Sequence, residues 1–231
     1  MSGSEAAVKE SAIRGENLRT KIKICGLTRE CDIDFVNEAL PDYVGFVFAK
    51  SRRQVNREQA QHLRKRLRPA VKTVGVFVNE PEEQLVRLAK EGILDMVQLH
   101  GSETPEFVEK IKHRLDCPVI KAVRLEEQSY PASFFRSYEQ AGVDVFLFDS
   151  GAVWEENADA RYGGTGRPFD WQLLPKTECP CFLAGGLNTE NIEKAILLTR
   201  PYAVDVSSGV ETDGVKDKDK ILEIVRRVRN V

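Results

Sequence analysis

The sequence predicts an α/β fold, namely a single (β/α)8 TIM barrel with a short N-terminal extension. Short apolar runs alternate with segments of helical spacing, and this alternation is typical of a parallel sheet. About eight such repeats follow Thr20, which suits closure into a barrel. The runs are continuously apolar, as expected for strands buried on both faces. The alternative is a doubly wound open sheet, but no G-x-G-x-x-G motif follows the first strand.

Each expected strand is a short, mostly apolar run, and together they are Ile22–Cys25, Tyr43–Phe48, Val71–Val78, Met96–Leu99, Val119–Val123, Val145–Phe148, Cys181–Ala184 and Ala203–Val206. Several of the segments between them begin with a residue type that caps helices, at Thr28, Asn56, Thr104 and Asn188. In the last helix, apolar residues recur on one face, at Ile221, Ile224, Val225 and Val228.

The chain is expected to divide into a flexible N-terminal tail at residues 1–20 and a barrel domain at residues 21–231. The tail is polar and contains three glutamates, so it resembles neither a transit peptide nor a signal peptide. The formal net charge of −2 over 231 residues gives no indication of binding to nucleic acid or to a membrane. We therefore expect neither partner.

Cysteine usage indicates a reducing compartment. The five cysteines are an odd number without a regular framework, so we expect reduced thiols in a cytoplasmic protein. Cys179 and Cys181 lack the C-x-x-C spacing of a zinc or redox site, and the three histidines are scattered. We therefore expect no metal site.

Two candidate catalytic groups follow expected strands, at the barrel end where active sites of this fold lie. Cys25 ends the first strand and precedes a capped helix, which favours a reactive thiol; the alternative is a small buried hydrophobe. Asp149 follows the sixth strand and is expected to face Cys25 across the barrel mouth as an acid. Its alternative role is to cap a turn.

The ends of the seventh and eighth strands predict a phosphate site. Gly185 and Gly186 follow the seventh strand, and the eighth continues into Asp205, Ser207, Ser208 and Gly209. Glycines allow close approach of backbone amides to a phosphate, and serine hydroxyls donate hydrogen bonds. The alternative is that the two glycines are only turn residues.

Other polar residues at strand ends are candidates for substrate contacts. Arg52 and Arg53 follow the second strand, where a guanidinium could hold a carboxylate with two hydrogen bonds; solvation on the surface is the alternative. Gln98 and His100 belong to the end of the fourth strand. A structural hydrogen bond is the alternative role for His100.

These motifs resemble those of the phosphoribosylanthranilate isomerases of tryptophan biosynthesis. The similarity extends from Lys21 to the C-terminus, in order, through KICGLT, VGFVF–SRRQV, VGVFVN, VQLHG, LFDS with GGTGRPFDW, LAGGLN and DVSSGVE. The resemblance implies an Amadori rearrangement of N-(5-phosphoribosyl)anthranilate to 1-(2-carboxyphenylamino)-1-deoxyribulose 5-phosphate, without a cofactor. The expected partner is a small phosphorylated substrate, and the expected assembly is a monomer or homodimer.

The resemblance also implies roles for individual residues. Asp149 would be the general acid that protonates the ring oxygen, and Cys25 the base that takes the C2′ proton. Arg52, rather than Arg53, would hold the anthranilate carboxylate, and residues 150–168 would form a lid. The remaining substrate contacts would come from Gln98, His100, Gly185, Gly186, Asp205, Ser207, Ser208 and Gly209.

Two other functions compete with this one. The related sugar-phosphate isomerase of histidine biosynthesis would have an aspartate in place of Cys25 and a second phosphate cradle, whereas Val78-Asn79-Glu80 lacks a glycine pair. A non-catalytic ligand-binding barrel would not need both Cys25 and Asp149. Loss of phosphoribosylanthranilate fluorescence on adding the protein would discriminate between these functions.

Overall fold

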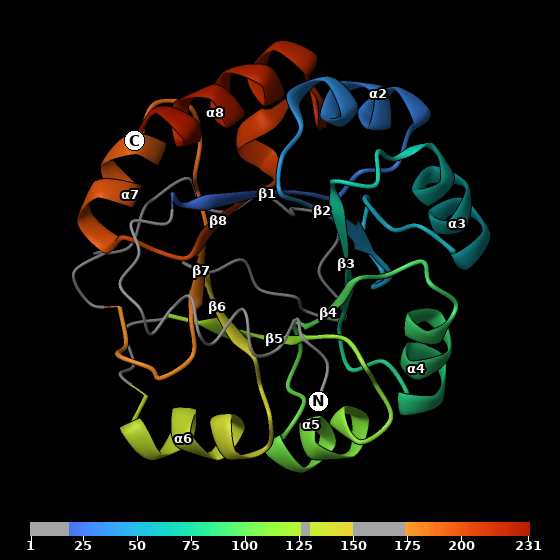
Figure 1. Ribbon diagram of the computed structural model, residues 1–231, viewed down its shortest axis with the longest axis vertical. Coiled ribbons are helices and arrows are strands. Elements are labelled where there is room, and N and C mark those ends of the chain that lie inside the picture. Colours follow the sequence, from blue (N-terminus) through green and yellow to red (C-terminus); the bar gives the residue numbers. More distant parts are fainter. Residues whose placement is uncertain (1–18, 126–129, 150–173) are drawn as a thin grey trace.

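The fold is a closed barrel of eight parallel strands, as the sequence predicts. The computed structural model describes residues 19–125, 130–149 and 174–231. The strands follow chain order around the barrel, which closes where β1 pairs with β8 (Figure 1). They are β1 (Lys21–Cys25), β2 (Tyr43–Val47), β3 (Lys72–Phe77), β4 (Met96–Leu99), β5 (Val119–Arg124), β6 (Val145–Asp149), β7 (Cys181–Ala184) and β8 (Ala203–Val206).

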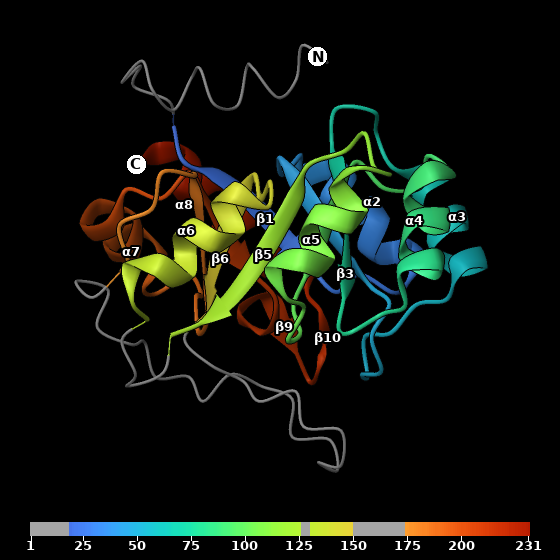
Figure 2. The ribbon, with the colours of Figure 1, turned by 90° about the horizontal axis from the view of Figure 1, so that it is seen from below.

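Helices form a ring around the barrel (Figure 1). In the described residues they are α2 (Glu30–Ala39), α3 (Arg57–Arg66), α4 (Glu82–Lys90), α5 (Pro105–Lys112), α6 (Ala132–Gln140), α7 (Ile192–Thr199) and α8 (Lys218–Asn230). Between β8 and α8 lie a short helix, η2 (Ser208–Val210), and an antiparallel hairpin that the sequence did not predict, β9 (Glu211–Thr212) with β10 (Val215–Lys216). Figure 2 shows this hairpin at the end toward which the β5 arrow points.

The helix starts match the expected caps in part. Asn56 accepts a hydrogen bond from the Gln59 amide at 2.8 Å, and Thr104 accepts one from the Phe107 amide at 3.4 Å, as predicted. Asn188 binds the amides of Glu190 and Asn191, so it caps the turn before α7 rather than α7 itself.

The prediction that Thr28 caps α2 is wrong. The carboxylate of Asp32, in the first turn, accepts hydrogen bonds from the amides of Thr28 and Arg29 at 3.0 and 2.9 Å, and Arg29 is the N-cap. Asp32 at the third helical position binds back to the backbone amide of Arg29, as in a capping box, and the N-cap therefore lies one residue after Thr28.

The interior of the barrel is mixed, and this positions the candidate site. On β1, Ile22 and Ile24 pack in the large core shared with the helices, whereas Lys23 and Cys25 alternate with them. The barrel interior carries its own apolar cluster, which includes Phe182. None of the helices in the described ranges is both long and apolar enough to cross a membrane.

Candidate active site

Cys25 lies where β1 packs closely against β2. It is the last residue of β1, is only 8% exposed, and stands opposite Gly45 of β2. A methyl group added to Gly45 would lie 2.5 Å from Cys25 Sγ. Gly45 therefore leaves the space that the sulfur occupies.

A fully buried lysine lies beside this thiol. Lys23 Nζ donates hydrogen bonds to Gln98 Oε1 at 2.8 Å and to Asp205 Oδ2 at 2.9 Å, and its charge interacts with Cys25. Sequence reasoning missed Lys23 as a site residue. The available signal was its place two residues before Cys25, on the same face of the strand.

The polar chain continues across the barrel mouth from Gln98 to Asp149. Gln98 Nε2 lies 2.7 Å from His100 Nδ1, and an amide nitrogen only donates, so Nδ1 accepts. In neutral His100 the proton is therefore on Nε2, which lies 3.6 Å from Asp149 Oδ2. Together with Lys23 of β1, these contacts link four of the predicted site residues: Gln98 of β4, His100 just after it, Asp149 of β6 and Asp205 of β8.

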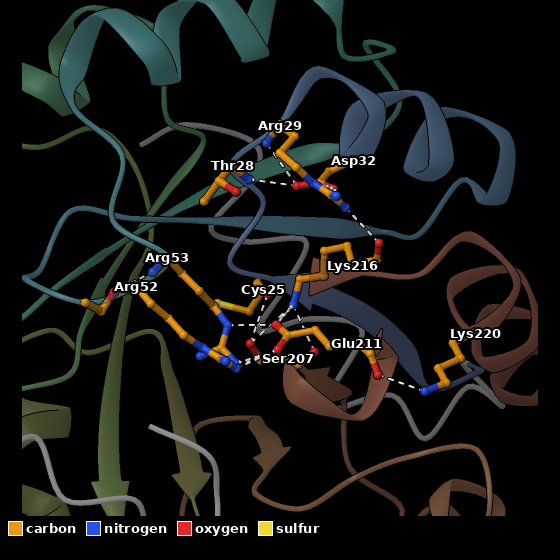
Figure 3. Close-up of polar contacts among 11 residues, drawn as sticks. Cys25, Thr28, Arg29, Asp32, Arg52, Arg53, Ser207, Glu211, Lys216 and Lys220 are labelled. Carbon is orange, nitrogen blue, oxygen red and sulfur yellow. Dashed lines mark hydrogen bonds and ion pairs between the residues drawn. The ribbon is translucent and has the colours of Figure 1, made fainter. Parts of the chain in front are cut away.

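On the other side of Cys25, Glu211 gathers three cations (Figure 3). Its carboxylate accepts from Arg53 Nε and Nη2 at 2.7 and 2.9 Å, from Arg52 Nη2 at 2.7 Å, and from Lys216 Nζ at 2.7 Å. We name Arg52, Arg53, Glu211 and Lys216 the Glu211 cluster. Neither Glu211 nor Lys216 was predicted as a site residue, because the arginines that bind Glu211 lie more than 150 residues away in the sequence.

Ser207 joins the Glu211 cluster to Cys25. Its hydroxyl donates to the Cys25 carbonyl oxygen at 3.1 Å, and its own carbonyl accepts from Lys216 Nζ at 2.9 Å (Figure 3). The loop after β8 is therefore fixed to the end of β1.

The two arginines of the Glu211 cluster differ in their distance from the thiol. A methyl group on Gly26, the neighbour of Cys25, would lie 2.4 Å from Arg53 Cδ, whereas one on Gly214 in the hairpin turn would lie 2.7 Å from Arg52 Nη1. The Arg53 side chain is 16% exposed and that of Arg52 is 42% exposed. Arg53 is thus the arginine beside Cys25.

The loops after β7 and β8 touch each other. Gly185 and Gly186 have φ values of +93° and +63°, which lie in the region that favours glycine. A methyl on Gly209 would lie 1.9 Å from the Leu187 carbonyl oxygen, so the two loops meet at backbone contact. Ser208 and Gly209 form the start of η2.

Burial and nearby charge act in opposite directions on the thiol. Burial raises the pKa of Cys25 above its ordinary value, while the ammonium groups of Lys23 and Lys216 lower it and Asp205 raises it. Burial alone would lower the pKa of Lys23, but the Asp205 carboxylate raises it and keeps the lysine charged. The pKa of Glu211 is lowered, because Arg53 and Lys216 outweigh its burial.

A second buried lysine supports the loop that carries His100. Lys121 of β5 donates to the Gly101 carbonyl at 2.7 Å and to Glu103 Oε2 at 2.8 Å. Glu103 also accepts from the Asn79 amide at 2.9 Å. A cavity of about 500 Å³ opens beside this loop, with His100, Lys121 and Asp149 in its lining.

The predicted lid, residues 150–168, lies outside the described residues, as does most of the predicted tail at residues 1–20. A larger cavity of about 720 Å³ lies at the opposite end of the barrel, where Tyr43 and Tyr202 line it. It contains none of the predicted site residues.

Comparison with known proteins gives one consistent match. The family model for N-(5'phosphoribosyl)anthranilate (PRA) isomerase matches residues 22–227. The N-(5'-phosphoribosyl)anthranilate isomerase of Endomicrobium trichonymphae is 45% identical over 211 residues, which cover 91% of this chain and 99% of that protein.

Solved structures agree. The phosphoribosyl anthranilate isomerase of Thermotoga maritima superposes with a TM-score of 0.75 at 39% identity, covering 92% of this chain and 100% of that one. An isomerase solved with reduced 1-(o-carboxyphenylamino)-1-deoxyribulose 5-phosphate has a TM-score of 0.70 at 36% identity, with coverages of 92% and 100%.

Proposed function

The chain belongs to the N-(5'-phosphoribosyl)anthranilate isomerase family, and we propose that Cys25 and Asp149 are the base and the acid of its reaction. The enzyme converts N-(5'-phosphoribosyl)anthranilate to 1-(2-carboxyphenylamino)-1-deoxyribulose 5-phosphate in tryptophan biosynthesis. One observation carries the assignment of roles: a thiol and a carboxylate project from β1 and β6 at the same end of the barrel, linked by a continuous polar chain.

The proposed mechanism moves protons within one substrate molecule. Asp149 protonates the furanose ring oxygen, the bond from that oxygen to C1′ breaks, and a Schiff base forms. Cys25 then takes the C2′ proton, which yields an enol-amine that tautomerises to the ketone. The rearrangement is internally redox-neutral, so its chemistry consumes no redox cofactor. Each acid or base role contributes about 10²–10⁴ in rate.

We place the substrate phosphate at the loops after β7 and β8. The positive φ values of Gly185 and Gly186 and the backbone contact at Gly209 support loops with little side-chain bulk, whose amides a phosphate could approach closely. The Ser207 hydroxyl, which already bonds the Cys25 carbonyl, would bring this phosphate site close to the base.

For the residue that binds the anthranilate carboxylate, the geometry favours a different arginine from the one that the resemblance implies. The resemblance pointed to Arg52, but Arg53 lies over the residue next to Cys25 and is the more buried of the two. We therefore propose Arg53 as the group that binds the anthranilate carboxylate. The Arg53 guanidinium already donates two hydrogen bonds to one carboxylate, that of Glu211.

The remaining assignments concern location and assembly. None of the five cysteines, all of which lie in the described ranges, forms a disulfide, which supports a cytoplasmic location. A monomer or homodimer is proposed as the assembly, to be measured by analytical ultracentrifugation.

The test of the mechanism is the decay of phosphoribosylanthranilate fluorescence with two variants. Cys25→Ala and Asp149→Asn should each lower kcat by at least about a hundredfold and change KM little. Cys117→Ala, which removes a thiol near the opposite end of the barrel, is the matched control and should keep near-normal kcat. Near-normal turnover of Cys25→Ala would assign the base to another group.

A further inference from the structure

The lysine beside the proposed base is costly to bury. Lys23 is 0% exposed, and lysines are rarely fully buried unless they are paired. An apolar residue at this inward position would avoid the loss of hydration of both Lys23 and its partner Asp205. A charge kept there at such cost calls for a role beyond packing.

The contacts of Lys23 suggest that role. An ammonium has three N–H groups; two of them bind Gln98 Oε1 and Asp205 Oδ2, and its charge acts on the sulfur of Cys25, two residues along the same face of β1. Asp205 Oδ1 is buried and has no hydrogen-bond partner among the described residues. Asp205 is therefore incompletely satisfied, and Lys23 is its ion-pair partner at 2.9 Å.

We propose that Lys23 is a positioning residue for the base: its ammonium favours the negatively charged, proton-accepting form of the Cys25 sulfur against the effect of burial, and Asp205 with Gln98 fixes the ammonium beside that sulfur. This inference rests on the proposed function, because it assigns Lys23 a part in catalysis only if Cys25 is the base. Its electrostatic part stands without that assumption.

Other charges face the sulfur from neighbouring elements. Lys216 of β10 favours the negative form, and Asp205 of β8 opposes it. Arg53 lies over Gly26, but both Arg53 and Lys216 are bound by the carboxylate of Glu211, which offsets their charge. Lys23 is the cation with the greatest effect on the sulfur, since it lies two residues away on the same face of β1.

The experiment measures the reactivity of Cys25 without substrate. The full-length protein is alkylated with iodoacetamide across a pH series, and modification of Cys25 is followed by peptide mass spectrometry, since only the thiolate reacts. In Lys23→Met, the Cys25 rate at pH 8 should fall about tenfold, and the midpoint of the rate–pH curve should move to higher pH. In Asp205→Asn, the rate should rise, because the charge that opposes the negative form of the sulfur is removed while an amide oxygen can still accept from Lys23.

These opposite signs separate the electrostatic role from a structural one. A variant that merely loosens the barrel would expose Cys25 and speed its alkylation, so a slower reaction in Lys23→Met has no such explanation. If Lys23→Met does not fold, the double variant Lys23→Met/Asp205→Asn, which leaves no unpaired charge, should react more slowly than Asp205→Asn alone. The midpoint of the Cys25 rate–pH curve is compared between Lys23→Met and the wild type, or between the double variant and Asp205→Asn. An unchanged midpoint in either comparison would overturn the proposal.

A matched control and an activity profile complete the test. Lys121→Met removes another buried barrel lysine and its ion pair, and it should leave the Cys25 midpoint where it is. In Lys23→Met, the rise of kcat/KM with pH should shift upward together with the alkylation midpoint. If alkylation shifts but Cys25→Ala remains active, the electrostatic role of Lys23 stands and the assignment of Cys25 as base fails. A Lys121→Met shift equal to that of Lys23→Met would also overturn the proposal.

Discussion

At the scale of single residues, Cys25 is governed by space and by charge. Gly45 supplies the space, because any side chain there would meet the sulfur. Burial raises the pKa of the thiol, and two ammonium groups oppose that rise. The reactivity of the thiol therefore depends on neighbours that do not contact the substrate in the proposed mechanism.

The Gly45 contact predicts a catalytic effect from one methyl group. In Gly45→Ala, the methyl would lie 2.5 Å from Cys25 Sγ, so the sulfur must move and kcat should fall about tenfold or more. KM should change less. The control is Gly75→Ala, whose methyl would meet Leu94 and Phe77 instead, away from the sulfur. Equal kcat losses in both variants would mean that the effect is general destabilisation.

The burial of Cys25 predicts the pH dependence of catalysis. Its pKa is raised, so at neutral pH most of the thiol is protonated and the base form increases with rising pH. We expect kcat/KM to rise between pH 6 and pH 8 with a slope of about one on a logarithmic scale. A steady-state pH profile checks this, and a flat profile over that range would contradict it.

At the scale of elements, loops after strands carry the site, and they are held to one another. The hairpin of β9 and β10 fixes the arginine loop after β2 through Glu211, and Ser207 fixes the end of β8 to β1. The loop after β4 is fixed through Glu103 and Lys121. Hydrogen bonds and ion pairs therefore hold the loops at the barrel mouth to one another.

The two arginines give a prediction for the loop after β2. Arg53→Ala should raise KM for phosphoribosylanthranilate at least about tenfold, because a bidentate charged contact is lost. Arg52→Ala, its neighbour in sequence and in the Glu211 cluster, is the matched control and should have a smaller effect. Steady-state kinetics of both variants decide the question, and the reverse ranking would restore Arg52 to the clamp.

The loop after β7 predicts a phosphate effect. Gly186 has a φ of +63°, which a β-branched residue rarely adopts, so Gly186→Val should displace the amides proposed to bind phosphate. KM should rise strongly. Protection by inorganic phosphate against thermal unfolding should weaken in the same variant. Unchanged KM together with unchanged protection would place the phosphate elsewhere.

The sequence made part of this site predictable. Local apolar runs predict where strands end, so the sequence alone places Cys25, His100 and Asp149 at one end of the barrel. The partners of Lys23 come from β4 and β8, and those of Glu211 from the loop after β2, so no local pattern indicates them. The Thr28 cap failed for a local reason: the Asp32 carboxylate binds the amides of Thr28 and Arg29, and Arg29 is the N-cap.

At the scale of the whole molecule, the first and last parts of the chain meet at the proposed base. β1 pairs with β8, and Ser207, Glu211 and Lys216 surround residues of β1 and of the loop after β2. Glu211 makes this junction dependent on charge as well as on strand pairing. Its carboxylate is 5% exposed and bound by three cations.

Acid should therefore weaken the whole fold through Glu211. Its pKa is lower in the folded chain than the ordinary carboxyl value, so its contribution is complete above the unfolded pKa and is lost as the pH falls through the folded pKa. Between pH 5 and pH 3, the wild-type protein should lose more thermal stability than Glu211→Gln does. Calorimetry at several pH values checks this, and parallel losses in the two proteins would contradict it.

The pairing of β1 with β8 also affects when the protein becomes active during its synthesis. Cys25 leaves the ribosome long before Ser207 and Lys216, which bond its carbonyl and act on its sulfur. A nascent chain that has not yet reached these residues carries an incomplete base. Translation that stops before these residues should therefore yield an inactive thiol rather than a partly active enzyme. Catalytic activity should appear in one step, when β1 pairs with β8 and the segment after β8 folds against Cys25.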